Sequence, residues 1–83
     1  MSKFKDEDID YIIEHLYERF KKAGTEENDD LIIKYSHEIR DWVKMKGIEV
    51  KDEKDLVTLF EELSNKISGK VEKKTMKVVT FED

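Results

Sequence analysis

The chain has 83 residues, no cysteine and a net charge of −5, from 21 acidic and 16 basic side chains. This length fits one small domain, and the lack of cysteine excludes a disulfide framework and a thiolate metal site. There is neither an apolar run of the ~20 residues that a membrane span needs nor a basic patch for phosphate backbones, so we expect a cytoplasmic protein that binds neither membranes nor nucleic acids directly.

The first predicted helix runs from about Asp6 to Ala23. Its first turn is acidic, which suits the positive end of the helix dipole. Gly24 is predicted to close the helix in the left-handed conformation. The apolar residues recur at steps of three and four and therefore share one face: Ile9, Ile12, Ile13, Leu16, Phe20 and Ala23.

The second predicted helix runs from about Glu26 to Lys46. Thr25 is a suitable N-cap, and Asn28 or Asp29 is the competing start. Gly47 provides the stop signal. The apolar stripe of this helix comprises Ile32, Tyr35, Ile39, Trp42 and Val43.

A short extended link, residues 48–50, precedes the third predicted helix, which runs from about Glu53 to Ser68. Asp52 is its predicted N-cap and Gly69 its predicted end. Its apolar face comprises Leu56, Leu59, Phe60, Leu63 and Ile67.

The pattern changes after residue 70. Thr75–Phe81 is rich in β-branched and aromatic residues that roughly alternate with polar ones, which predicts one strand. A single strand needs partners for its backbone groups. It either pairs with Ile48–Val50, pairs with another molecule, or lies along the domain as a tail.

Together these elements predict an all-α, or mainly α, fold. Residues 1–70 form a bundle of three antiparallel helices, and residues 71–83 form a strand-like tail of the same domain. Although 45% of the residues are charged, the helical spacing of the apolar ones argues against disorder. The predicted core comprises Ile9, Ile13, Leu16, Phe20, Ile32, Tyr35, Ile39, Trp42, Leu56, Leu59, Phe60, Leu63 and Ile67.

Two apolar side chains, Tyr11 and Ile33, point away from the stripes of their helices. Single exposed apolar residues are common. The alternatives are that the tail folds back over them, or that they belong to a partner surface, where tyrosine is enriched.

Catalytic chemistry has little support in the sequence. His15 and His37 are the two histidines, and neither lies in a metal-binding spacing such as HExxH. The serines lack a nucleophile-elbow context, and there is no glycine-rich phosphate loop. A helix-turn-helix interpretation fails because three acids begin the helix that would read DNA. We therefore expect no enzyme, no cofactor and no bound metal.

The sequence instead predicts a small protein-interaction module, a regulator, adaptor or inhibitor that binds a larger protein. A free strand edge can add to a partner's sheet or pair with a second copy to make a homodimer. The candidate partner-binding residues are Tyr11, Ile33, Thr75, Lys77, Val79 and Phe81.

An acidic mimic of nucleic acid, of the kind that phages and mobile elements encode, is the alternative. Residues 1–30 hold ten acids and five bases, which equals the whole net charge of −5. Clustered carboxylates on a rigid helix steer toward the basic groove of a nucleic-acid enzyme. The candidate acidic patch comprises Asp6, Glu7, Asp8, Asp10, Glu14, Glu18, Glu26, Glu27, Asp29 and Asp30.

Overall fold

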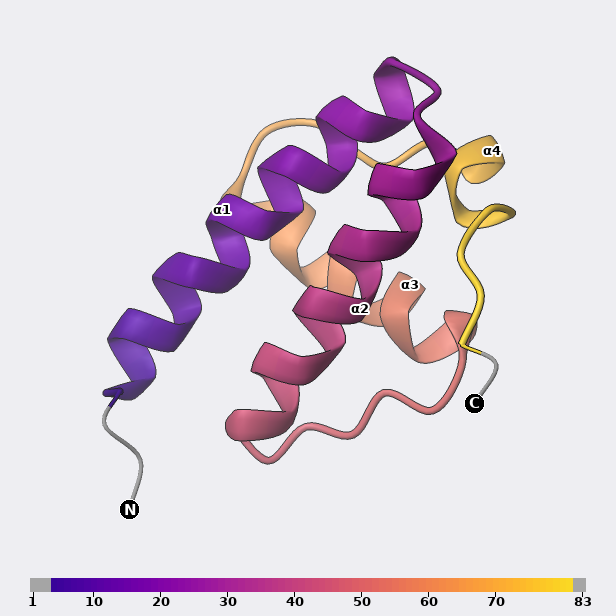
Figure 1. The fold of residues 1–83 in the computed structure, drawn as a ribbon. Coiled ribbons are helices and arrows are strands. Elements are labelled where there is room, and N and C mark those ends of the chain that lie inside the picture. Colours follow the sequence, from indigo (N-terminus) through magenta and orange to yellow (C-terminus); the bar gives the residue numbers. More distant parts are fainter. Residues whose placement is uncertain (1–3, 82–83) are drawn as a thin grey trace.

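The structure, a computed structural model, describes residues 4–81. Three long helices, α1 (Asp6–Thr25), α2 (Asp29–Met45) and α3 (Glu53–Lys66), precede a single turn, α4 (Lys73–Met76) (Figure 1). This confirms the predicted all-α class. The strand predicted at Thr75–Phe81 is wrong, because no strand occurs within residues 4–81. The last two residues of the predicted tail, 82–83, lie outside the described residues.

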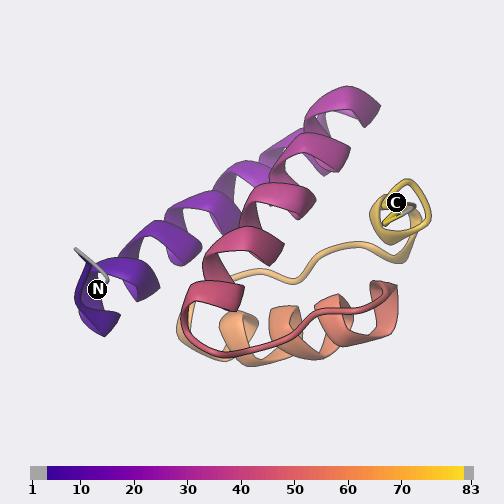
Figure 2. The same cartoon turned by 60° about the horizontal axis from the view of Figure 1, so that its bottom comes forward.

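The helices form two layers. Only residues 26–28 join α1 to α2, so these helices run antiparallel and side by side as a hairpin. The third helix crosses the hairpin instead of running antiparallel to its neighbours, and the chain after it returns along the same layer (Figure 2). The shortest extent of the Cα positions is 19 Å, which matches two layers of helices packed 8–10 Å apart.

Side-chain caps fix two of the helix starts. The side-chain oxygen of Asn28 accepts a hydrogen bond from the Leu31 amide at 3.2 Å, so α2 begins at the alternative start and not after Thr25. The Asp52 carboxylate accepts from the Asp55 amide at 3.1 Å, which confirms the predicted cap of α3.

Gly24 does not end α1 in the left-handed conformation, and this prediction is wrong. The helix continues through Thr25, and Glu27 takes the positive φ, at 54°. Gly24 is instead buried under Thr75. A Cβ atom on Gly24 would lie 2.5 Å from the Thr75 hydroxyl oxygen and 2.9 Å from its methyl carbon. The missing side chain therefore lets the end of the chain approach α1 closely.

Aromatic rings join the two layers at the centre of the core. The Phe60 ring lies with its centroid 4.8 Å from that of Phe20 and 5.1 Å from that of Tyr17. Nine of the thirteen predicted core residues are buried, and Tyr35, Trp42, Leu59 and Ile67 are partly buried. The core also includes residues outside the prediction: Tyr17, Ala23, Ser36, Val43, Val50, Thr75 and Val79.

Residues 67–81, here called the strap, lead from the end of α3 back over the hairpin (Figures 1 and 2). Lys21 donates to the Ser68 carbonyl at 2.5 Å, and Tyr17 donates to the Gly69 carbonyl at 3.3 Å. Further along, Lys74 pairs with Glu27 at 3.2 Å. Side-chain contacts with α1 and with the connection between α1 and α2 thus replace the strand pairing that was predicted.

Phe60→Ala should lower the free energy of unfolding by about 3–5 kcal/mol, because it removes a buried ring that contacts both Phe20 and Tyr17. Urea denaturation followed by far-ultraviolet circular dichroism measures this loss. A change below about 1 kcal/mol would show that the two layers do not depend on this ring.

Gly24→Ala should destabilise the protein by about 1–3 kcal/mol, because strain against Thr75 exceeds the gain of about 1 kcal/mol that alanine brings to a helix. Thr75→Ala removes both crowded atoms. In urea denaturation, the loss of unfolding free energy in the double variant should therefore be about 1 kcal/mol smaller than the sum of the losses in the two single variants. Additive changes would contradict the close contact between α1 and the strap.

Candidate functional site

The structure separates the predicted partner-binding residues into three groups: exposed, buried and partly buried. Tyr11 is 62% exposed, with its ring centroid 4.3 Å from that of His15, and Lys77 is exposed. By contrast, Thr75 and Val79 are only 4% and 2% exposed. Their side chains therefore belong to the core in this fold, and the strap offers no strand edge.

The third group comprises Ile33 and Phe81, and Phe81 lies where the strap meets α2. Ile33 is partly buried and shares one side of the helix with His37 and Arg40, four and seven residues later. His37 Nε2 lies 2.6 Å from the Thr80 carbonyl oxygen, and the Arg40 guanidinium lies 4.8 Å from the centre of the Phe81 ring. The strap thus lies against the side of α2 that carries Ile33, whereas Tyr11 stays at the surface.

The candidate acidic patch extends along α1. Four of its carboxylates occupy the first turns of that helix, Glu14 and Glu18 lie in its middle, and the other four occupy the connection to α2 and the first turn of α2, a helix length of about 30 Å away. Three of the ten carboxylates form ion pairs within the chain: Asp10 with Lys46, Glu18 with Lys21, and Glu27 with Lys74. The pairs of Asp10 and Glu18 reduce the negative charge along the middle of α1.

A groove of about 640 Å³ lies between α3 and the strap. Phe60 and Val57 come from α3, Tyr17 comes from α1, and Val71 and Met76 come from the strap. Val57 is 37% exposed, and Val71 and Met76 are partly buried, so the apolar surface of the groove is open to solvent. We call this feature the α3–strap groove.

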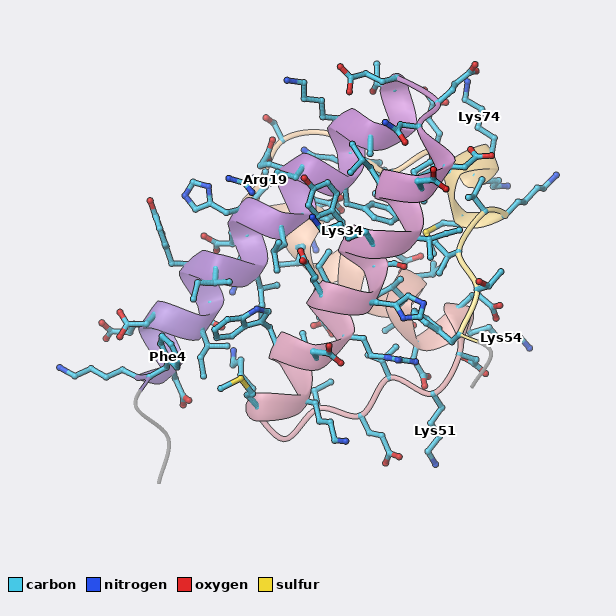
Figure 3. All side chains as sticks on the ribbon, viewed as in Figure 1. Phe4, Arg19, Lys34, Lys51, Lys54 and Lys74 are labelled. Carbon is cyan, nitrogen blue, oxygen red and sulfur yellow. The ribbon has the colours of Figure 1, made fainter. Side chains whose placement is uncertain are left out.

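Polar side chains edge the two walls of the α3–strap groove with different charges. Glu61, Ser64 and Asn65 line the wall of α3, whereas Lys70 and Lys73 line the wall of the strap. Within residues 4–81 neither of these lysines forms an ion pair. The neighbouring Lys74 differs, because its hydrogen bond to Glu27 and the nearby Glu72 raise its pKa. Figure 3 shows Lys74 beside α4.

A second apolar surface lies at the end of the hairpin that is far from the connection between α1 and α2. The Phe4 ring packs edge-on against Trp42, with a centroid distance of 5.2 Å. Met45, one turn further along α2, is 49% exposed, and Ile48 follows in the link. Phe4 lies at the start of α1 in Figure 3. Trp42 itself is partly buried.

The two histidines and the many acids do not combine into a metal site in the part of the chain that the structure describes. No group of three or more His, Asp or Glu side chains in this part of the chain converges on a point that could hold a metal ion. His15 and His37 contact different partners, Tyr11 and the strap. None of the helices seen here is long and apolar enough to cross a membrane.

Burial perturbs one titratable group beside the α3–strap groove. Removal from water raises the pKa of the Tyr17 hydroxyl above its ordinary value of 10.0, and the nearby Glu18 carboxylate adds to the effect. The neutral hydroxyl donates to Gly69. Tyr17 therefore acts as a structural support for the strap.

Sequence patterns alone did not reveal the α3–strap groove, although one signal was present. Val57 follows Leu56 and widens the apolar face of α3 toward the wall that becomes the groove. The contribution of Val71 and Met76 depends on the path of the strap. Comparisons with protein-family models, with curated proteins and with solved structures found no match, so function must be argued from these surfaces.

Raising the pH should destabilise the wild type more than Tyr17→Phe. Because folding raises the pKa of Tyr17, its stabilising contribution is complete below the unfolded-state value near 10 and is lost as the pH rises toward the folded-state value. At pH ~8 the variant should be less stable by about 0.5–1.5 kcal/mol through loss of the hydrogen bond. Urea denaturation at pH ~8 and ~10.5 should show that the difference in unfolding free energy between wild type and variant is smaller at the higher pH. An equal difference at both pH values would contradict burial of the hydroxyl.

Proposed function

We propose that this chain is a non-enzymatic protein-interaction module, a small regulator, adaptor or inhibitor that binds a larger protein through the α3–strap groove. The observation that carries the proposal is the groove itself. Val57, Val71 and Met76 expose apolar surface at its centre, and polar side chains edge both walls. An apolar centre surrounded by a polar rim is the usual anatomy of a protein–protein interface.

The exposure and lining of the groove also support a protein partner over a substrate. The groove is open to solvent between two elements, and its charged side chains lie on both walls. Its only hydroxyls are those of Ser64, which donates to the Glu61 carbonyl, and Tyr17, which donates to Gly69. Binding, with no bond making or breaking, is the activity that these groups support.

The alternative function, an acidic mimic of nucleic acid, has less support. Exposed carboxylates of Asp6, Glu7 and Asp8 make the first turn of α1 strongly negative. A mimic, however, must present a run of free charge that follows a phosphate backbone, and here Asp10, Glu18 and Glu27 are ion-paired within the chain. Loss of the partner between ~50 and 200 mM salt would favour this alternative, because exposed charges are screened in that range.

Val57→Glu should abolish partner binding and leave the fold intact. The change puts a charge at the centre of the proposed interface, but its site is partly exposed and glutamate is a good helix former. Affinity capture from the native host, with quantitative mass spectrometry, should recover a partner with the wild type and at least about tenfold less with the variant.

Two matched variants control for the new charge. Met45→Glu and Tyr11→Glu place the same group at exposed apolar positions on other faces of the hairpin. Both should retain the partner, and circular dichroism should show all three variants folded. Capture of no protein by the wild type would contradict the proposed function, and loss of the partner with Met45→Glu or Tyr11→Glu alone would place the interface outside the groove.

A further inference from the structure

We propose that the occupant of the α3–strap groove is an amphipathic α-helix of the partner that carries carboxylates beside its apolar face. This inference rests on the proposed function and specifies the chemistry of the partner. Four features support it: the length of the groove, its apolar lining, the charges of its walls and the lack of a suitable helix in the chain itself.

The length of the groove matches two turns of helix. The residues of α3 that line it run from Val57 to Asn65, which is about 12 Å at 1.5 Å per residue. Two turns of an incoming helix occupy about 11 Å, so apolar side chains at positions i, i+4 and i+7 would all reach the groove. An extended peptide would place only about two side chains over the same distance.

Its lining suits side chains of variable shape. Phe60 supplies a rigid, almost fully buried floor, because its ring is held between those of Phe20 and Tyr17. Met76, at the end of α4, is partly buried and has an unbranched side chain that adapts to what it contacts. A rigid aromatic floor beside an adaptable thioether favours leucine-like side chains of an amphipathic helix.

The charges on the walls of the groove indicate which side chains flank the apolar face of the incoming helix. Lys70 and Lys73 bring two positive charges to the strap wall, whereas Glu61 brings one negative charge to the wall of α3. The groove is therefore positive by one charge within a chain whose net charge is −5. Because neither lysine is ion-paired within the described residues, carboxylates of a partner can approach both of them.

A second copy of the chain does not supply such a helix. The apolar stripes of α1, α2 and α3 are buried in their own core, so within residues 4–81 no helix presents a continuous free apolar face. Five large apolar residues are exposed in this part of the chain, and they are scattered: Phe4 before α1, Tyr11 on α1, Met45 at the end of α2, Ile48 in the link, and Val57 in the groove itself. The occupant is accordingly a different protein.

Two synthetic peptides test this inference. Each has about 18 residues, which allows a helix to form, and leucines at i, i+4, i+7 and i+11. One carries glutamates on both flanks of the leucine face, and the other carries lysines there. Because both flanks are alike, the strap wall meets the same charge whichever way the helix runs in the groove. Fluorescence anisotropy of labelled peptide at ~50 mM salt measures affinity, and amide chemical shifts of the ¹⁵N-labelled protein locate the site.

The acidic peptide should bind at least about threefold more tightly than the basic one and should shift the amides of Val57, Phe60 and Val71. Lys70→Glu combined with Lys73→Glu should weaken the acidic peptide about tenfold and strengthen the basic one. The matched control is Lys34→Glu with Lys51→Glu, which makes the same change in net charge on α2 and on the link before α3 (Figure 3). This control should change either affinity less than about twofold.

Several outcomes would overturn the inference. They are tighter binding of the basic peptide, equal effects of the two charge-reversed pairs, amide shifts confined to the Phe4–Met45 end, and self-association of the free chain through Val57 in analytical ultracentrifugation. Failure of both peptides while Val57→Glu still loses a captured partner would reject the acidic helix and leave the proposed function standing. Failure of the capture experiment as well would reject both.

Discussion

The contact of Phe60 with Tyr17 and Phe20 is the interaction on which the rest of this structure depends. It joins α3 to the hairpin, with ring centroids 5.1 and 4.8 Å apart. A buried tyrosine hydroxyl needs a hydrogen-bond partner, and Tyr17 finds it in the carbonyl of Gly69. The same side chain therefore packs the core and holds the strap. The α3–strap groove exists because the strap is held at this point and the Phe60 ring closes the bottom of the space beside it.

The three long helices could be predicted because their apolar spacing and caps agree with each other. Asp52 and Asn28 show this well, since each is a local signal whose hydrogen bond forms within one turn. The strap could not be predicted in this way. Alternation from Thr75 to Phe81 favours a strand, yet the buried residues are Thr75 and Val79, which are four apart, as on one face of a helical turn. Packing against Gly24 outweighs the β-propensity of this segment.

The groove was beyond sequence reasoning for a related reason. It combines Tyr17 of α1, Val57 and Phe60 of α3, and Val71 and Met76 of the strap, so its lining joins residues that are up to 59 positions apart. No local pattern encodes such a set. Gly24 illustrates the same limit, because its position after a helical stripe favours a helix end, whereas its role is to admit Thr75 against α1. Tyr11 was recognisable as an outlier, since its exposure follows from helical geometry alone.

The charge pattern separates long-range attraction from local recognition. Most of the excess acid lies at the two ends of α1, so the field far from the molecule is negative and attracts basic partners toward the hairpin. Lys70 and Lys73 act only over a short distance, because screening at physiological salt limits an exposed charge to about 8 Å. An acidic helix must therefore approach against the overall field and gains its ion pairs only once its apolar face is in the groove. This arrangement slows the association of acidic proteins in general. Only acidic helices that also fit the apolar surface of the groove then bind well, so repulsion and shape together determine specificity.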